Sequence, residues 1–169
     1  MVDRLTLTKE RISAMAEGVR QVIDLRDPSG IVLDEFTRPN GLAIKKVSVP
    51  LGVIAIIFES RPNVTVDAAA LCIKAGNACV LRGGSEAIAS NTALTSVIRQ
   101  GLKAAGLPEN SVNIIENTDR ALVKELLTLR GFIDLAIPPR RCRPDPHGRR
   151  YGHRSLHRNG KRRLPRLCR

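Results

Sequence analysis

Two short turns carry the polar residues most able to do chemistry. The first reads Phe58-Glu59-Ser60-Arg61-Pro62-Asn63, and the second reads Arg82-Gly83-Gly84-Ser85-Glu86; each follows an apolar run. The two glycines allow the backbone to approach a ligand closely, and a helix N-terminus behind them favours an anion. Arg82 adds a forked donor for a phosphate or a ribose, so the second turn is a candidate nucleotide-binding turn.

Each turn also has a purely structural interpretation. Gly83 and Gly84 also suit an ordinary strand-to-helix turn that needs tight packing, with Ser85 as the cap of the helix that follows. Glu59 and Arg61 either bind a substrate or pair with each other at the surface, and their spacing favours the surface pair. The chain has no Gly-x-Gly-x-x-Gly motif, so the common dinucleotide fingerprint is not supported.

The cysteines and histidines do not form a catalytic or metal-binding pattern. Cys72 and Cys79 lie in apolar segments, which predicts inert core residues. The remaining cysteines and all the histidines lie near the C-terminus, at spacings that match no standard zinc site: Cys142, His147, His153, His157 and Cys168. We therefore expect no metal.

These turns need strands and helices to position them, and the apolar pattern supplies both. Thr8 is a candidate cap for an amphipathic helix that stops by Asp27-Pro28, and two strand-like runs around Asn40-Gly41 predict a β-hairpin. Beyond Pro50, apolar runs alternate with helical segments. Strands are expected near 53–58, 78–81, 112–115 and 132–137, with helices near 66–75, 85–105 and 118–129. This alternation predicts an α/β fold with a parallel sheet and helices on both faces.

The charge is concentrated at one end of the chain. The net charge is +12, and residues 140–169 hold eleven Arg and one Lys against one acid. Subtracting these from 28 basic and 16 acidic residues leaves 16 and 15, so residues 1–139 carry only +1. The tail lacks apolar periodicity, which predicts disorder. No apolar run reaches the roughly 18 residues that span a bilayer, and the N-terminus has no signal pattern; a cytoplasmic protein without a membrane partner is expected.

Several segments resemble one enzyme family. The stretches are Pro50-Leu51-Gly52-Val53-Ile54, residues 59–72, residues 74–78, and Val80-Leu81-Arg82-Gly83-Gly84-Ser85-Glu86-Ala87, with further matches at 3–8 and 117–120. Together they resemble γ-glutamyl phosphate reductase, also called glutamate-5-semialdehyde dehydrogenase, of the aldehyde dehydrogenase superfamily. The resemblance runs from about Asp3 to Pro138.

The resemblance implies an activity and a cofactor site. The family reduces L-glutamyl 5-phosphate to L-glutamate 5-semialdehyde and phosphate with NADPH, in proline biosynthesis, after a Cys attacks the acyl phosphate. By similarity, Phe58, Glu59 and Ser60 lie beside the cofactor, and Arg82, Gly83, Gly84 and Ser85 lie near its adenosine ribose. The hairpin resembles the arm through which the family forms homo-oligomers.

The resemblance also suggests how the chain is divided. We expect an N-terminal helix in residues 1–29, a hairpin arm in 30–49, a partial Rossmann-like NADP-binding domain in 50–139, and an Arg-rich tail in 140–169. Family members are more than twice this length, so the chain is expected to be a truncated piece that lacks the catalytic Cys and is inactive alone.

The tail departs from the family in an informative way. After Ile137 the family continues Arg-Gly-Gly-Ala-Gly-Leu-Ile, whereas this chain reads Pro138-Pro139-Arg140-Arg141-Cys142-Arg143-Pro144. With the frame moved by one nucleotide, the codons from Arg140 through Pro144 into Asp145 can encode Gly-Gly-Ala-Gly-Leu. Codons for Leu164 to Cys168 can likewise encode Cys-His-Val-Tyr, the family's nucleophile region. We interpret the tail as a frameshift product.

Two other interpretations remain open. An Arg-rich tail binds phosphate backbones whatever its origin, so the alternative function is nucleic-acid binding through residues 140–169. The hairpin also suits a structural partner of a full-length homologue. The codons of the tail separate the first alternative from the enzyme interpretation, because a tail selected for its own function has no reason to encode an enzyme in the next frame.

The frameshift interpretation predicts the nucleotide sequence of the gene. A single-base correction near the codons for Pro138 and Pro139 is expected to open a frame that encodes Gly-Gly-Ala-Gly-Leu and, further on, Cys-His. Sequencing the locus measures this directly. If no one-base shift opens such a frame, the tail is a genuine extension that needs a function of its own.

Overall fold

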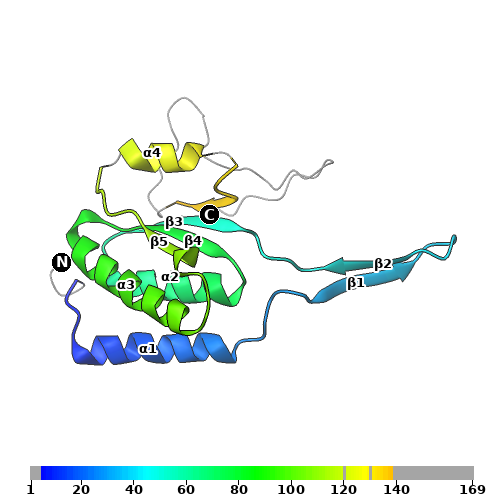
Figure 1. The fold of residues 1–169 in the computed structure, drawn as a ribbon, viewed down its shortest axis with the longest axis horizontal. Helices are drawn as coiled ribbons and strands as arrows, with labels where there is room; N and C mark the ends of the chain where they lie inside the picture. The colour runs from blue at the N-terminus through cyan, green and yellow to red at the C-terminus, as the bar shows by residue number, and fades with distance from the viewer. Residues whose placement is uncertain (1–4, 120, 130, 139–169) are drawn as a thin grey trace, which may run out of the picture.

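A computed structural model describes residues 5–119, 121–129 and 131–138. The main body is an α/β sheet domain, with one further helix beside it and a two-stranded arm extending from it (Figure 1). The tail and its expected disorder lie outside the described residues. No helix within the described ranges is long and apolar enough to cross a membrane.

The sheet has four parallel strands. They are β3 (Val53–Ile57), β4 (Ala78–Arg82), β5 (Val112–Ile114) and β6 (Leu135–Ile137), in the order β5-β4-β3-β6. The predicted parallel sheet is therefore confirmed. β6 starts later than the expected 132, because the backbone N–H groups of Phe132 and Ile133 donate back to the Leu129 carbonyl in a turn.

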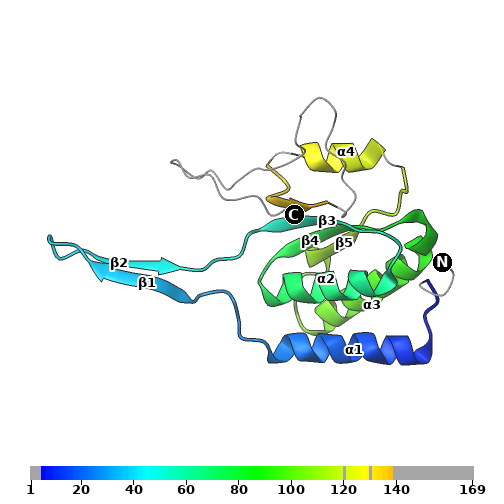
Figure 2. The same cartoon turned by 180° about the vertical axis from the view of Figure 1, so that it is seen from behind.

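Helices cover both faces of this sheet, as the sequence predicts. α2 (Pro62–Lys74) and α3 (Ile88–Ala104) pack on one face, and α4 (Ala121–Thr128) packs on the other (Figure 2). The strand β3 shows why its apolar run is continuous: Ile54 joins the cluster under α2, whereas Ala55 and Ile57 join the cluster under α4. Successive side chains of a strand point to opposite faces, so both faces need apolar residues.

Helix starts differ from expectation at two places. α2 begins at Pro62, four residues before the expected Val66, because proline at the first helical position needs no N–H partner and its φ suits a helix. Ser85 does not cap α3. A short 3₁₀ turn, η2 (Ser85–Ala87), comes first, α3 starts at Ile88, and neither start has a side-chain cap bond.

The N-terminal helix and the hairpin match their predictions. α1 (Lys9–Asp24) is capped by Thr8, whose Oγ1 accepts the Arg11 backbone N–H at 3.3 Å, and it packs against α2. β1 (Val32–Thr37) and β2 (Ala43–Val47) pair antiparallel and extend away from the sheet domain (Figure 1). A second 3₁₀ turn, η3 (Glu109–Ser111), leads into β5.

Polar side chains fix the N-terminal end of the central strand β3. Asn77 Oδ1 accepts the backbone N–H groups of Leu51 and Gly52 at 2.6 and 3.0 Å, and Asp134 Oδ2 accepts the Val53 N–H at 2.9 Å. Gly52 has a φ of +113°, and a Cβ there would overlap the Asp134 carboxylate. The start of β3 therefore requires a residue without a side chain.

Gly52→Ala is expected to lower the free energy of unfolding by about 2 kcal/mol or more, because it combines an unfavourable φ with an overlap. The matched control is Gly106→Ala: Gly106 also has a positive φ, +72°, but faces open space. We expect it to lose only about 1 kcal/mol in urea unfolding. Adding Asp134→Ala removes the overlap, so the Gly52→Ala penalty should shrink in that background; equal penalties for the two glycines would contradict this account.

Candidate functional site

The two candidate turns lie side by side at the carboxyl edge of the sheet. The Phe58 backbone N–H donates to the Arg82 carbonyl at 3.0 Å, which extends the β3–β4 pairing by one residue. The Ser60 hydroxyl donates to Glu86 Oε2 at 2.6 Å. Parallel neighbours end at the same edge, so segments more than twenty residues apart form one polar surface.

This surface also lies where the strand order reverses. The chain moves outward from β3 to β4 and β5, then returns to place β6 on the other side of β3. In open α/β sheets ligands bind outside the carboxyl ends of the strands at such a reversal. The turn after β3 is therefore at the position where this fold class binds ligands.

Both glycines of the second turn lie close to neighbouring side chains; Gly83 is buried and Gly84 is half-buried. A Cβ on Gly83 would overlap Asn91 Nδ2 and come within 3.2 Å of the Phe58 ring. A Cβ on Gly84 would lie 2.7 Å from Ser60 Oγ and 2.8 Å from Glu86 Oε2. The tight-packing interpretation thus accounts for both glycines, and the same packing brings the two turns together.

The other predicted residues differ in what they present to a ligand. Phe58 is a core residue, so its ring packs inside, whereas Glu59 and Ser85 are exposed. Arg82 is half-buried, and its Nη2 donates to the Thr118 carbonyl at 2.9 Å. Its Nε is buried and has no hydrogen-bond partner within the described ranges. The Arg82 guanidinium is therefore held by one hydrogen bond, while its buried Nε donor has no partner in the described chain.

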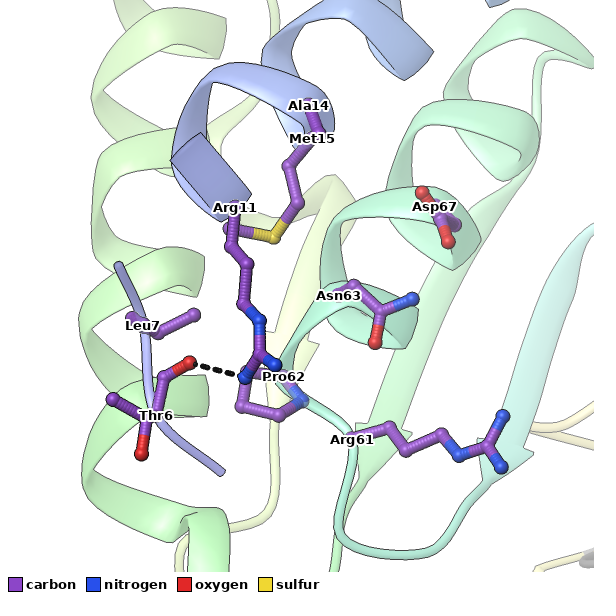
Figure 3. Close-up of a pocket in the computed structure, with 9 residues that line it drawn as sticks. All are labelled: Thr6, Leu7, Arg11, Ala14, Met15, Arg61, Pro62, Asn63 and Asp67. Carbon is purple, nitrogen blue, oxygen red and sulfur yellow. Dashed lines mark hydrogen bonds between the residues drawn. The ribbon is translucent and has the colours of Figure 1, made fainter. Parts of the chain in front are cut away.

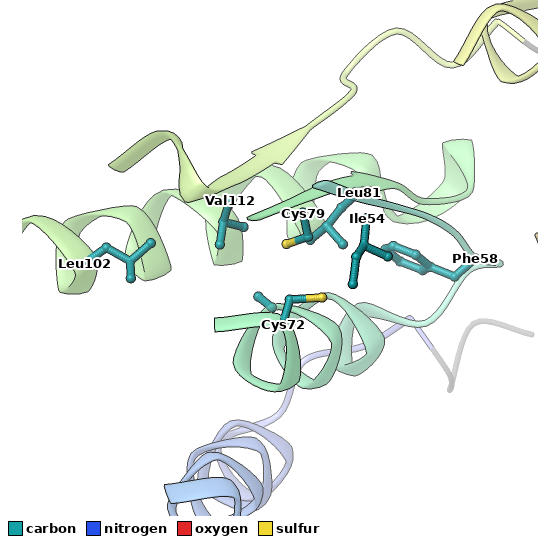
Figure 4. Close-up of a cluster of buried hydrophobic side chains, with 8 residues drawn as sticks. Ile54, Phe58, Cys72, Cys79, Leu81, Leu102 and Val112 are labelled. Atoms are coloured by element: carbon teal, nitrogen blue, oxygen red, sulfur yellow. The ribbon is translucent and has the colours of Figure 1, made fainter. Parts of the chain in front are cut away.

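The two cysteines of the described chain are core residues (Figure 4). Cys72 from α2 and Cys79 from β4 are 6% and 0% exposed, in the same apolar cluster. The hydrogen bond with Cys72 and burial both raise the pKa of the Cys79 thiol above its ordinary value. A buried thiol that resists ionisation is a poor nucleophile. Among the described residues, no group of three or more potential metal ligands occurs.

A cavity of about 500 Å³ lies beside the first turn, between the starts of α1 and α2 (Figure 3). Its lining residues are Thr6, Leu7, Arg11, Ala14, Met15, Arg61, Pro62, Asn63 and Asp67. Arg61, Pro62 and Asn63 belong to the first candidate turn, and Arg61 was predicted to be a substrate ligand or the partner of Glu59. The ion pairs found within the described ranges do not include a Glu59–Arg61 pair.

Most of the other lining residues, which lie in residues 6–15, were not predicted because that segment is remote in the sequence. α1 contributes Arg11 and Met15 only through its packing on α2. Asp67 lies one helical turn beyond Asn63, and burial raises the pKa of its carboxyl group, although a hydrogen bond from Asn63 partly offsets this. A carboxylate at helical spacing from Asn63 was the signal in the sequence, but nothing there indicated that α1 faces it.

Known proteins give a consistent match over most of the chain. No protein-family model matches. The γ-glutamyl phosphate reductase of Halalkalibacterium halodurans is 58% identical over 139 residues, which are 82% of this chain and 33% of the relative. The solved structure of the Thermotoga maritima enzyme of the same name superposes with a TM-score of 0.79 at 52% identity, over 81% of this chain and 33% of that one.

More distant structures share the fold. An acetylating aldehyde dehydrogenase from Geobacillus thermoglucosidasius has a TM-score of 0.57 at 19% identity, covering 72% of this chain and 26% of its own. An engineered glycolyl-CoA reductase with bound NADP⁺ has a TM-score of 0.56 at 20% identity, covering 79% and 34%. The chain spans about a third of the length of the curated relatives it matches. By sequence and by fold, this chain is similar to γ-glutamyl phosphate reductases over about one third of their length, and it shares the fold of the more distant aldehyde dehydrogenase.

Proposed function

We propose that residues 50–139 form part of an NADPH site in an enzyme that reduces L-glutamyl 5-phosphate to L-glutamate 5-semialdehyde and phosphate. The observation that carries this proposal is the contact between the Phe58–Ser60 and Arg82–Ser85 turns where the strand order reverses. The relatives' shared name supplies the reaction and its place in proline biosynthesis.

The residues present fit a dinucleotide. Arg82 has a buried Nε without an acceptor in the described chain, and its guanidinium is already oriented by Thr118. A phosphate or ribose oxygen would satisfy that donor. Ser85 adds an exposed hydroxyl next to it. The carboxylates of Glu59 and Glu86 lie at the same edge and suit hydroxyl groups, so the edge offers partners for both a ribose and an anion.

The two turns would contact different parts of the cofactor. Arg82, Gly83, Gly84 and Ser85 hold the adenosine end, while Glu59, Ser60 and the Phe58 backbone lie beside the rest of the cofactor. NADPH, when bound, supplies the hydride for the reduction. The protein's part is to orient that cofactor and exclude water, and the Ser60–Glu86 bond fixes one turn against the other. The engineered reductase that shares this fold holds NADP⁺, which supports a nicotinamide cofactor.

The cysteine that attacks the acyl phosphate in the proposed reaction is neither Cys72 nor Cys79. Cys72 and Cys79 are buried in the core, away from the turns' polar surface. We therefore propose that residues 1–29, 30–49 and 50–139 serve as helix, oligomerisation arm and cofactor domain of a cytoplasmic enzyme whose reactive Cys lies outside them. The relatives offer no support for nucleic-acid binding, and residues 1–139 carry only +1.

NADPH is expected to bind the purified chain, and Arg82→Gln is expected to weaken binding about tenfold or more, because it removes a charge-assisted donor. Titration with NADPH, followed by its fluorescence, measures this. The matched control is Arg99→Gln: the Arg99 guanidinium also bonds a neutral oxygen, Asn110 Oδ1 at 2.9 Å, but away from the turns. Thermal unfolding of both variants separates lost binding from lost folding.

Two outcomes would contradict the proposal. One is NADPH affinity that Arg82→Gln and Arg99→Gln change equally. The other is phosphate-dependent oxidation of glutamate 5-semialdehyde by this chain alone with NADP⁺, because both cysteines of the described residues are buried. We expect no turnover above a blank without enzyme.

A further inference from the structure

Asn91 is a buried polar side chain at the point where the second turn, α2 and α3 meet. It lies in the first turn of α3 and is 0% exposed. Its Oδ1 accepts a hydrogen bond from the Thr65 hydroxyl of α2 at 3.1 Å, and Thr65 is also 0% exposed. One end of the Asn91 carboxamide is therefore held by the helix that follows the first turn.

The other end of the carboxamide lies next to the second turn. A Cβ on Gly83 would overlap Asn91 Nδ2, so the amide nitrogen and Gly83 are in close contact. Asn91 Nδ2 is buried and has no hydrogen-bond partner in the described part of the chain. An unpaired buried donor lowers stability, so it calls for a reason other than the stability of the fold.

The conformation of the second turn supplies such a reason. Two consecutive glycines have wide conformational freedom, whereas Arg82 and Ser85 on either side of them need fixed positions to bind a ligand. The Phe58 ring also approaches Gly83, within 3.2 Å of the same Cβ position. Of these two neighbours of Gly83, Asn91 is the polar one, and the Thr65 hydroxyl sets its direction.

We propose that Asn91 is a positioning residue of the cofactor site. The Thr65 hydroxyl fixes its carboxamide, and its amide group holds Gly83 so that Arg82 and Ser85 face the cofactor. Asn91 does not contact the cofactor itself, because its amide nitrogen is buried behind the turn. This inference rests on the proposed function, in which the second turn binds the adenosine end of NADPH.

Two buried threonines provide a matched test. The Thr65 hydroxyl bonds the Asn91 side chain, whereas the Thr95 hydroxyl bonds the Asn91 backbone carbonyl at 2.8 Å, and Thr95 is 2% exposed. Valine at either position keeps the volume and removes one buried hydrogen bond. Only Thr65→Val releases the carboxamide, so we expect it to weaken NADPH binding by the full chain about fivefold, the effect of one hydrogen bond.

The controls separate positioning from folding. Thr95→Val is expected to leave NADPH affinity unchanged, and Thr65→Ser, which restores the hydroxyl, is expected to restore the affinity. Thermal unfolding of the two valine variants should shift by similar amounts, because each loses one buried hydrogen bond. Hydrogen exchange of residues 83–85 without ligand should be faster in Thr65→Val than in Thr95→Val, because only the first loosens the turn.

The results also separate this inference from the proposed function. If the unsubstituted chain binds NADPH, equal affinities of the two valine variants, or a Thr65→Ser variant as weak as Thr65→Val, would overturn the role of Asn91 and leave the Arg82 site standing. If the unsubstituted chain does not bind NADPH, the proposed function fails. Hydrogen exchange then decides: faster exchange in Thr65→Val alone keeps Asn91 as the support of the turn, and equal exchange rejects it.

Discussion

The parallel pairing of β3 with β4 is the interaction on which the rest of the structure depends. It aligns Ile57 with Arg82, and the next hydrogen bond, from the Phe58 N–H to the Arg82 carbonyl, joins the two turns beyond the strands. A slip of one residue would exchange the two faces of β3 and move Ile54 out of its cluster. Burial of apolar β3 side chains on both faces of the sheet therefore fixes the register, and the register in turn fixes where the two turns lie.

The two ends of β3 have different tasks. At its start, Asn77 and Asp134 satisfy backbone N–H groups of residues 51–53, and Gly52 supplies a conformation that other residues resist. At its end, small residues let turns pack together, and Gly83 sits against Asn91 and Phe58. At both ends, therefore, the absence of a side chain on glycine allows close packing, against Asp134 at Gly52 and against Asn91 and Phe58 at Gly83. At the carboxyl end, the buried Arg82 Nε is left without a hydrogen-bond partner in the described part of the chain.

One short connection joins the two polar turns to the neighbouring cavity. Pro62 starts α2 immediately after Arg61, so the chain passes from the first turn into the cavity wall within two residues. α1 then closes the opposite wall through its packing on α2. The polar turn and the cavity are adjacent because β3, the turn and α2 follow one another directly in the chain.

The sequence by itself determined the elements and the family. Continuous apolar runs indicated strands buried on both faces, Asn40-Gly41 indicated the hairpin, and residues 50–87 carried the resemblance. These are local signals, which chain periodicity and turn chemistry record. The sequence did not predict that α2 starts at Pro62 or that a 3₁₀ turn at Ser85 precedes α3, because residue propensities locate helix ends only to within a few residues. It also left open whether the glycines serve packing or ligand approach, because that depends on which side chains lie beside them. Only the tertiary structure placed α1 on α2, because which helix faces meet depends on packing between distant segments; Arg11 and Asp67 became neighbours of one cavity for that reason.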